Sequence, residues 1–146
     1  MLYYLSLGSN LGDRESTLRS ALQLIEQQIG SVLRCSSFYY SKPWGFTSAN
    51  DFCNLCCALE TDKKPLDVLR LTQTIERSLG RTKKTQINKH QSPITNYSDR
   101  PIDIDLIRVF DNDKKELFMD SPELTLPHRF WQERDFVKVP LAEIMH

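Results

Sequence analysis

Two kinds of hydrophobic periodicity divide this chain into strands and helices. Four segments show either a short apolar run or an alternation of apolar and polar residues, and both patterns predict β-strands: 3–7, 31–41, 51–61 and 101–110. Two segments repeat apolar residues every three or four positions, which predicts helices: 13–30 and 64–80. The chain therefore starts in the order β-α-β-β-α-β.

Residues typical of helix ends support both predicted helices. The first helix starts near Asp13 and ends at Gly30, and the second starts with Pro65 in its first turn and ends at Gly80. After the last predicted strand the pattern is weaker. We expect three short pieces there, namely an edge strand, a helical turn and a packed segment: 117–119, 124–129 and 139–144.

The predicted order of elements defines an expected fold class. A β-α-β-β-α-β order is typical of an α+β, ferredoxin-like sandwich with an antiparallel sheet. In that arrangement helices cover one face of the sheet, and we expect the other face to be open for a ligand. At 146 residues, the whole chain (1–146) is expected to form a single domain.

Composition excludes some functions. The formal net charge is zero, so no overall field favours nucleic acid or a membrane surface. The first residues read as a strand and not as a signal peptide, and no apolar run has the length of a membrane span. The four cysteines complete no zinc set and are expected to be reduced, which predicts a cytoplasmic location.

The main chemical candidate is the pair Asp103 and Asp105. Alternation with Ile102, Ile104 and Leu106 places both carboxylates on one face of the strand, about 6.5–7 Å apart. Such a pair suits two Mg²⁺ ions about 3.5–4 Å apart that also bind phosphate oxygens. A half-exposed strand that happens to carry two aspartates is the alternative.

Basic and aromatic residues in two predicted loops add to this candidate site. Arg100 precedes the pair, and its guanidinium matches phosphate geometry. The polar, basic stretch 81–98 lacks periodicity, so it reads either as a mobile lid over an anionic ligand or as a disordered insertion. The loop 42–50 holds Trp44, which could cover a flat ligand or plug the core.

Several separated motifs agree with one family. They follow one another along nearly the whole chain: Leu7-Gly8-Ser9-Asn10-Leu11-Gly12, Ser36-Ser37-Phe38-Tyr39, Phe52-Cys53-Asn54, Ile75-Glu76-Arg77-Ser78-Leu79-Gly80-Arg81, Arg100-Pro101-Ile102-Asp103-Ile104-Asp105-Leu106, Leu126-Pro127-His128 and Arg134-Asp135-Phe136-Val137. Together they resemble the 6-hydroxymethyl-7,8-dihydropterin pyrophosphokinases of folate biosynthesis. The resemblance implies an Mg²⁺-dependent transfer of diphosphate from ATP to a dihydropterin, with release of AMP.

The resemblance also implies roles for individual residues. Asp103 and Asp105 would hold two Mg²⁺ ions and, with Arg81 and Arg100, form the catalytic set. The residues that match ATP contacts of the family are Gln73, Glu76, Arg81, Lys83, Arg100, His128 and Arg134. Those that match the pterin slot are Gly8, Trp44, Phe52, Asn54 and Phe136. The stretch after Arg81 corresponds to the family's mobile catalytic loop. We assign no side chain as a general base. We expect the protein to be a monomer.

Two other functions agree with part of this pattern. A palm-type nucleotidyl transferase also carries paired aspartates on a similar sheet, but it would need a third acidic ligand and has no use for a pterin slot. A non-catalytic small-molecule binding domain would not need the two aspartates. This chain departs from the family in places, for instance at Lys83, where many relatives have an arginine.

Overall fold

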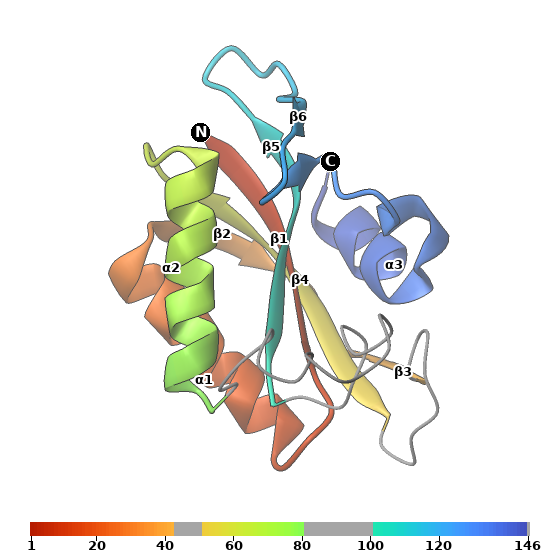
Figure 1. The fold of residues 1–146 in the computed structure, drawn as a ribbon. Coiled ribbons are helices and arrows are strands. Elements are labelled where there is room, and N and C mark those ends of the chain that lie inside the picture. Colours follow the sequence, from red (N-terminus) through yellow and green to blue (C-terminus); the bar gives the residue numbers. More distant parts are fainter. Residues whose placement is uncertain (43–50, 81–100, 146) are drawn as a thin grey trace.

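The computed structural model describes residues 1–42, 51–80 and 101–145. Figure 1 shows its elements, which follow one another along the chain as β1 (Leu2–Ser9), α1 (Arg14–Gln28), β2 (Ser31–Cys35), β3 (Tyr39–Ser41), β4 (Phe52–Glu60), α2 (Pro65–Ser78), β5 (Asp103–Phe110), β6 (Met119–Asp120), β7 (Thr125–Leu126), a 3₁₀ helix (Trp131–Glu133) and α3 (Asp135–Ile144). Of the loop predicted over 42–50, residues 43–50 lie outside the described residues, and so does the basic stretch 81–98.

The two predicted helices are confirmed, with the expected ends. The Asp13 side chain accepts a hydrogen bond of 3.1 Å from the Ser16 backbone N–H and so caps α1. Pro65 is the first residue of α2. Gly80 follows the last turn of α2 with φ of +102°, a backbone conformation that favours glycine.

The main sheet is antiparallel, with strand order β2-β4-β1-β5 and β3 also paired to β4. The single strand predicted over 31–41 is two strands, β2 and β3. The cause is a tertiary contact: Ser36 donates its N–H to the Cys56 carbonyl (2.8 Å), and its hydroxyl accepts the Cys56 N–H (2.9 Å). The Ser36 hydroxyl therefore replaces a backbone carbonyl as the acceptor of the Cys56 N–H. The pairing register with β4 shifts between β2 and β3.

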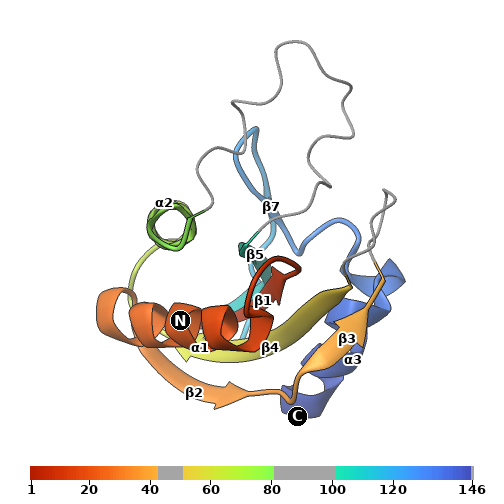
Figure 2. The same cartoon turned by 90° about the horizontal axis from the view of Figure 1, so that it is seen from below.

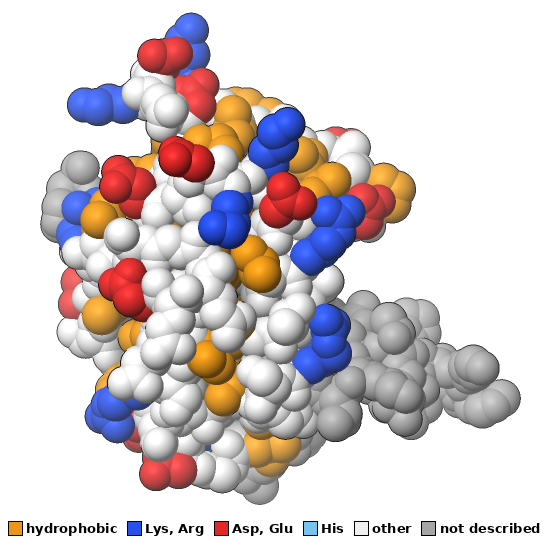
Figure 3. Space-filling view, turned by 90° about the vertical axis from the view of Figure 1, so that its left-hand side faces the viewer, with side chains coloured by type: hydrophobic (Ala, Val, Ile, Leu, Met, Phe, Trp, Pro, Cys, Tyr) orange, Lys and Arg blue, Asp and Glu red, His pale blue; other side chains and the backbone are white. Residues whose placement is uncertain are grey.

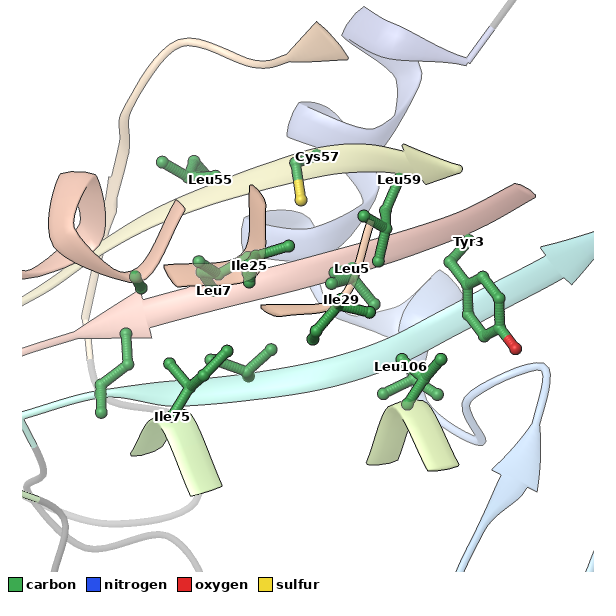
Figure 4. Close-up of a cluster of buried hydrophobic side chains, with 14 of the residues drawn as sticks. Tyr3, Leu5, Leu7, Ile25, Ile29, Leu55, Cys57, Leu59, Ile75 and Leu106 are labelled. Carbon is green, nitrogen blue, oxygen red and sulfur yellow. The ribbon is translucent and has the colours of Figure 1, made fainter. Parts of the chain in front are cut away.

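The larger core lies between the sheet and the helices α1 and α2. Tyr3, Leu5 and Leu7 of β1 project into it from the sheet, and Ile25 and Ile75 meet them from the two helices (Figure 4). Each fully buried leucine or isoleucine side chain contributes about 1.5–3 kcal/mol to folding. The outward face of α1 and α2 mixes acidic and basic side chains with scattered apolar ones (Figure 3).

A third helix packs on the opposite face of the sheet, so the expectation that helices cover one face alone was wrong. Figures 1 and 2 show α3 across the sheet from α1 and α2. Its apolar residues Val137, Leu141 and Ile144 recur at helical spacing and pack on a smaller cluster formed by Tyr4, Cys56, Ala58 and Ile107. Pro140, buried within α3, obscured this helix in the sequence.

The segment between β5 and α3 also differs from its prediction. The helical turn expected over 124–129 is wrong, because β7 is extended and pairs with β6 in a small separate sheet. A proline disfavours helical backbone at the residue before it, and Leu126-Pro127 is a cis peptide. The His128 N–H then bonds to the Ile107 carbonyl of β5 at 2.8 Å, which fixes this segment beside β5.

Candidate active site

Asp103 and Asp105 lie on the face of β5 that points away from the larger core. Both are partly exposed, whereas Ile104 and Leu106 between and beyond them are 2% exposed and belong to that core. The predicted alternation is therefore confirmed. The strand carries the two carboxylates on the same side of the sheet as α3, beside the area that α3 covers.

Strand pairing brings further polar positions to the same face. Asp103 is opposite Gly8, which is opposite Asn54, and Asp105 is opposite Ser6. Adjacent strands are about 4.8 Å apart, so these positions form two short rows across three strands. We use the term carboxylate face for the residues Ser6, Gly8, Phe52, Asn54, Asp103 and Asp105. Three of the residues predicted for a pterin slot thus share a face with the aspartate pair.

Asn54 of β4 and Gly8 of β1 form one row of the carboxylate face with Asp103. The Asn54 side chain is 2% exposed, and its Nδ2 donates to the Tyr39 carbonyl (3.0 Å) and to the Ser41 hydroxyl (2.9 Å). Its Oδ1 is directed toward Gly8, where a methyl group would lie 2.9 Å from it. The absence of a side chain at Gly8 therefore lets the Asn54 amide pack closely against β1.

Burial and neighbouring charge keep His128 neutral. Its Nδ1 accepts the Phe130 N–H at 3.3 Å, so the ring proton of the neutral imidazole resides on Nε2. Burial and, to a smaller extent, the Arg134 guanidinium lower the pKa of His128 to about 4, against an opposing effect of Asp103. His128, Arg134 and Asp103 are therefore within electrostatic reach of one another.

Arg134 is buried between aromatic rings. Its side chain is 7% exposed, and the guanidinium lies 5.5 Å from the centre of the Phe130 ring and 5.7 Å from that of Phe136. Stacking of this kind fixes the plane of a guanidinium while leaving its charge in place. Phe136, predicted for the pterin slot, in turn packs against the cluster under α3.

Glu76 occupies a place that the sequence did not predict. Gln73, Glu76 and Arg77 lie off the apolar stripe of α2, which usually means a solvated face. Glu76 is instead 2% exposed, and its carboxylate accepts the Ile104 N–H at 2.8 Å. Gln73 is half-buried and Arg77 is exposed.

Sequence reasoning missed two serines of this region. Ser6 lies between Asp105 and Cys56 across the strands, and Ser41 holds the Asn54 amide. A polar residue within the otherwise apolar strand β1 was the available signal for Ser6. Four predicted site residues lie outside the described part of the chain, so their positions stay predictions: Trp44, Arg81, Lys83 and Arg100.

The donor set fits Mg²⁺ better than a metal held by protein ligands alone. Within the described residues, no group of three or more His, Cys, Asp or Glu side chains could hold a metal ion. Two carboxylates on one strand suit Mg²⁺, because this ion keeps several waters and takes substrate phosphates as further ligands.

Comparison with known proteins identifies the family. The family model described as 7,8-dihydro-6-hydroxymethylpterin-pyrophosphokinase (HPPK) matches residues 4–146. The chain belongs to the HPPK family. A relative named 2-amino-4-hydroxy-6-hydroxymethyldihydropteridine pyrophosphokinase from Porphyromonas gingivalis is 46% identical over 143 residues, which cover 98% of this chain and 90% of the relative. A relative of the same name from Bacillus subtilis is 35% identical, and the match covers 97% of this chain and 76% of that relative.

Solved structures support the fold of this HPPK chain. One described as HPPK-DHPS in complex with substrates has a TM-score of 0.64 at 16% identity. The wild-type Plasmodium falciparum HPPK-DHPS with pterin and p-hydroxybenzoate has a TM-score of 0.65 at 16% identity. This chain is covered to 98% in both comparisons, but it spans 40% and 39% of those longer chains. The shared architecture is a mixed α/β fold, which in the described part of this chain has an antiparallel sheet and three α-helices.

Proposed function

We propose that this protein transfers diphosphate from ATP to 6-hydroxymethyl-7,8-dihydropterin, giving AMP and the pterin diphosphate in folate biosynthesis. The observation that carries the proposal is the carboxylate face, where the aspartate pair of β5 shares one surface with Gly8, Phe52 and Asn54. Its supports are the family membership and the names of the relatives.

In the proposed reaction Asp103 and Asp105 hold two Mg²⁺ ions, which neutralise phosphate charge when bound. The pterin hydroxyl oxygen forms a bond to the β-phosphorus of ATP. The bond from that phosphorus to the oxygen bridging it to the α-phosphorus breaks, and AMP leaves with the electron pair. The hydroxyl proton is released to solvent in this scheme, and we assign no side chain as a general base.

On the pterin side, we infer that Phe52 and Phe136, with Trp44, stack on a flat ring. The Nδ2 of Asn54 is already engaged by Tyr39 and Ser41, so Asn54 offers its Oδ1 as an acceptor. An acceptor in this place selects a ring edge that carries N–H donors, as a pterin does.

On the nucleotide side, we infer that positive charge comes from Arg81, Lys83, Arg100 and Arg134, with Gln73 and Glu76 on α2 nearby. His128 contributes differently from these cations. Its pKa of about 4 leaves it neutral near pH 7, so it offers an Nε2–H donor without a charge. Orientation and charge neutralisation are the main requirements of such a transfer.

Several broader features belong to the same proposal. We infer a single ferredoxin-like domain over 1–146, with the strand order β2-β4-β1-β5 as its support. We further infer a monomer and closure of the basic stretch after Arg81 over ATP. The described residues contain no helix that is long and apolar enough to cross a membrane. A cytoplasmic location stays a prediction from the four free cysteines.

The test is an AMP-release assay with ATP, Mg²⁺ and 6-hydroxymethyl-7,8-dihydropterin, omitting each in turn. We expect AMP only in the complete mixture. Asp105→Asn should lower the rate by about a hundredfold or more, because one metal-binding carboxylate is lost. Asp113→Asn is the matched control, since Asp113 is exposed in the turn after β5. AMP release without pterin, or an active Asp105→Asn, would contradict the proposal.

A further inference from the structure

The strand that carries the aspartate pair lies at an edge of the main sheet. In the order β2-β4-β1-β5, β5 pairs with β1 on one side, and among the described residues no strand lies on the other. The outward N–H and C=O groups of an edge strand need other partners when they are buried. In β5 several of these groups are bonded by residues that lie outside the main sheet.

Those partners differ along the strand. Toward the end of β5, the Ile107 carbonyl accepts the His128 N–H and the Val109 carbonyl accepts the Leu117 N–H, both at 2.8 Å. At the start of β5, the partner is a side chain: the Glu76 carboxylate accepts the Ile104 N–H at 2.8 Å, in a buried position. This is the amide between the two aspartates.

The geometry of Glu76 separates it from the carboxylate face. The Ile104 side chain projects into the larger core toward α1 and α2, and the Ile104 N–H that Glu76 accepts points outward in the plane of the sheet, so the Glu76 carboxylate lies beside β5 and not on the face that Asp103 and Asp105 share. A buried carboxylate bonded to an amide is also a short, strong type of hydrogen bond.

We propose that Glu76 is a positioning residue, which acts on the reaction through the backbone of Ile104 and thereby fixes the spacing of Asp103 and Asp105. This inference rests on the proposed function. It revises the role implied by family resemblance, which was direct contact with ATP. A metal-binding pair loses affinity when its supporting hydrogen bonds are removed, typically by about tenfold to a hundredfold.

Three variants of α2 separate this role from others. Glu76→Leu removes the acceptor, and Glu76→Gln keeps an acceptor oxygen at the same chain length but removes the charge. Thr72→Val is the matched control, because Thr72 is also buried on α2 and its hydroxyl bonds within the helix to the Leu69 carbonyl (2.7 Å). Thr72→Val can weaken α2 without removing the bond to β5.

Two measurements are made on each purified variant. The first is Mn²⁺ affinity in the presence of α,β-methylene-ATP, which cannot release AMP, followed by Mn²⁺ electron paramagnetic resonance. The second is hydrogen-exchange protection of the Ile104 amide by NMR. We expect Glu76→Leu to weaken Mn²⁺ affinity about tenfold or more and to lose Ile104 protection. Glu76→Gln should retain both within about threefold, and Thr72→Val should retain both.

Three results would overturn the proposal. Unchanged Mn²⁺ affinity or unchanged Ile104 protection in Glu76→Leu would show that the bond does not support the pair. If Glu76→Gln keeps Ile104 protected but binds Mn²⁺ as poorly as Glu76→Leu, the charge acts directly on the ligand. Should Glu76→Leu not fold, Glu76→Gln decides by the same readouts. If the wild-type protein binds no Mn²⁺ with the nucleotide, the proposed function fails, and Ile104 protection alone decides the role of Glu76.

Discussion

Acidification should destabilise this protein through His128. In the folded state the pKa of His128 is about 4, below its ordinary value of 6.5, because the ring is buried and Arg134 lies nearby. The unfolded chain therefore binds a proton between pH 6.5 and 4 that the folded chain does not. The free energy of unfolding is unaffected by His128 above pH 6.5 and falls as the pH is lowered through this window. The part of the loss that is due to His128 is complete below pH 4.

The size of the effect follows from the two pKa values. Each pKa unit of difference between the folded and unfolded states corresponds to about 1.4 kcal/mol. The gap between 6.5 and about 4 therefore amounts to about 3 kcal/mol in full. At pH 5, where most of the unfolded chains carry the extra proton, we expect about 2 kcal/mol of this loss. That is a large part of the stability of a small domain.

Urea unfolding at several pH values between 7.5 and 4.5 measures this loss. Carboxylates also titrate in this window, so the quantity of interest is the difference between the wild type and His128→Asn. The asparagine Oδ1 can accept the Phe130 N–H in place of Nδ1 and does not titrate. The wild type should lose about 2 kcal/mol more than His128→Asn between pH 7.5 and 5. Parallel curves for the two proteins would refute the reasoning.

Three other predictions concern the pterin slot, the thiols and a partly buried ion pair. Gly8→Ala should weaken pterin binding about tenfold, measured by pterin fluorescence, because its methyl group would lie 2.9 Å from Asn54 Oδ1; binding equal to the wild type would contradict this. A disulfide reagent should modify Cys35 quickly and the other three cysteines slowly, since burial raises the pKa of their thiols; Cys35→Ser should lose the fast phase. Arg108→Leu should lower the free energy of unfolding by about 2 kcal/mol, because Arg108 makes two bonds to Glu116 at 2.7 and 2.8 Å; a double-mutant cycle with Glu116→Gln that gives no coupling would count against it.

Local periodicity was enough to predict the elements that are apolar on one side. The helices α1 and α2 and the alternation of β5 have such patterns, and their cap residues fix the ends. The break between β2 and β3 could not be predicted, because it depends on bonds between Ser36 and Cys56, twenty residues apart. In α3, Pro140 concealed a helical pattern that tertiary packing stabilises.

The candidate site was predictable to a similar extent. The shared face of Asp103 and Asp105 follows from strand geometry alone. Family resemblance pointed to Gly8 and Asn54, and strand pairing places them on that face. The burial of Glu76 against Ile104 depends on how α2 lies along β5, which no local pattern encodes.

The most direct test of the central claim is the fate of the β-phosphorus of ATP. The protein would be incubated with Mg²⁺, 6-hydroxymethyl-7,8-dihydropterin and ATP labelled with ³²P at the β-position, and the products separated by chromatography. We predict that the label appears on the pterin, in equal amount to the AMP released. Label in free pyrophosphate would indicate nucleotidyl transfer, and label in ADP would indicate transfer of a single phosphate; either result would contradict the proposed diphosphate transfer.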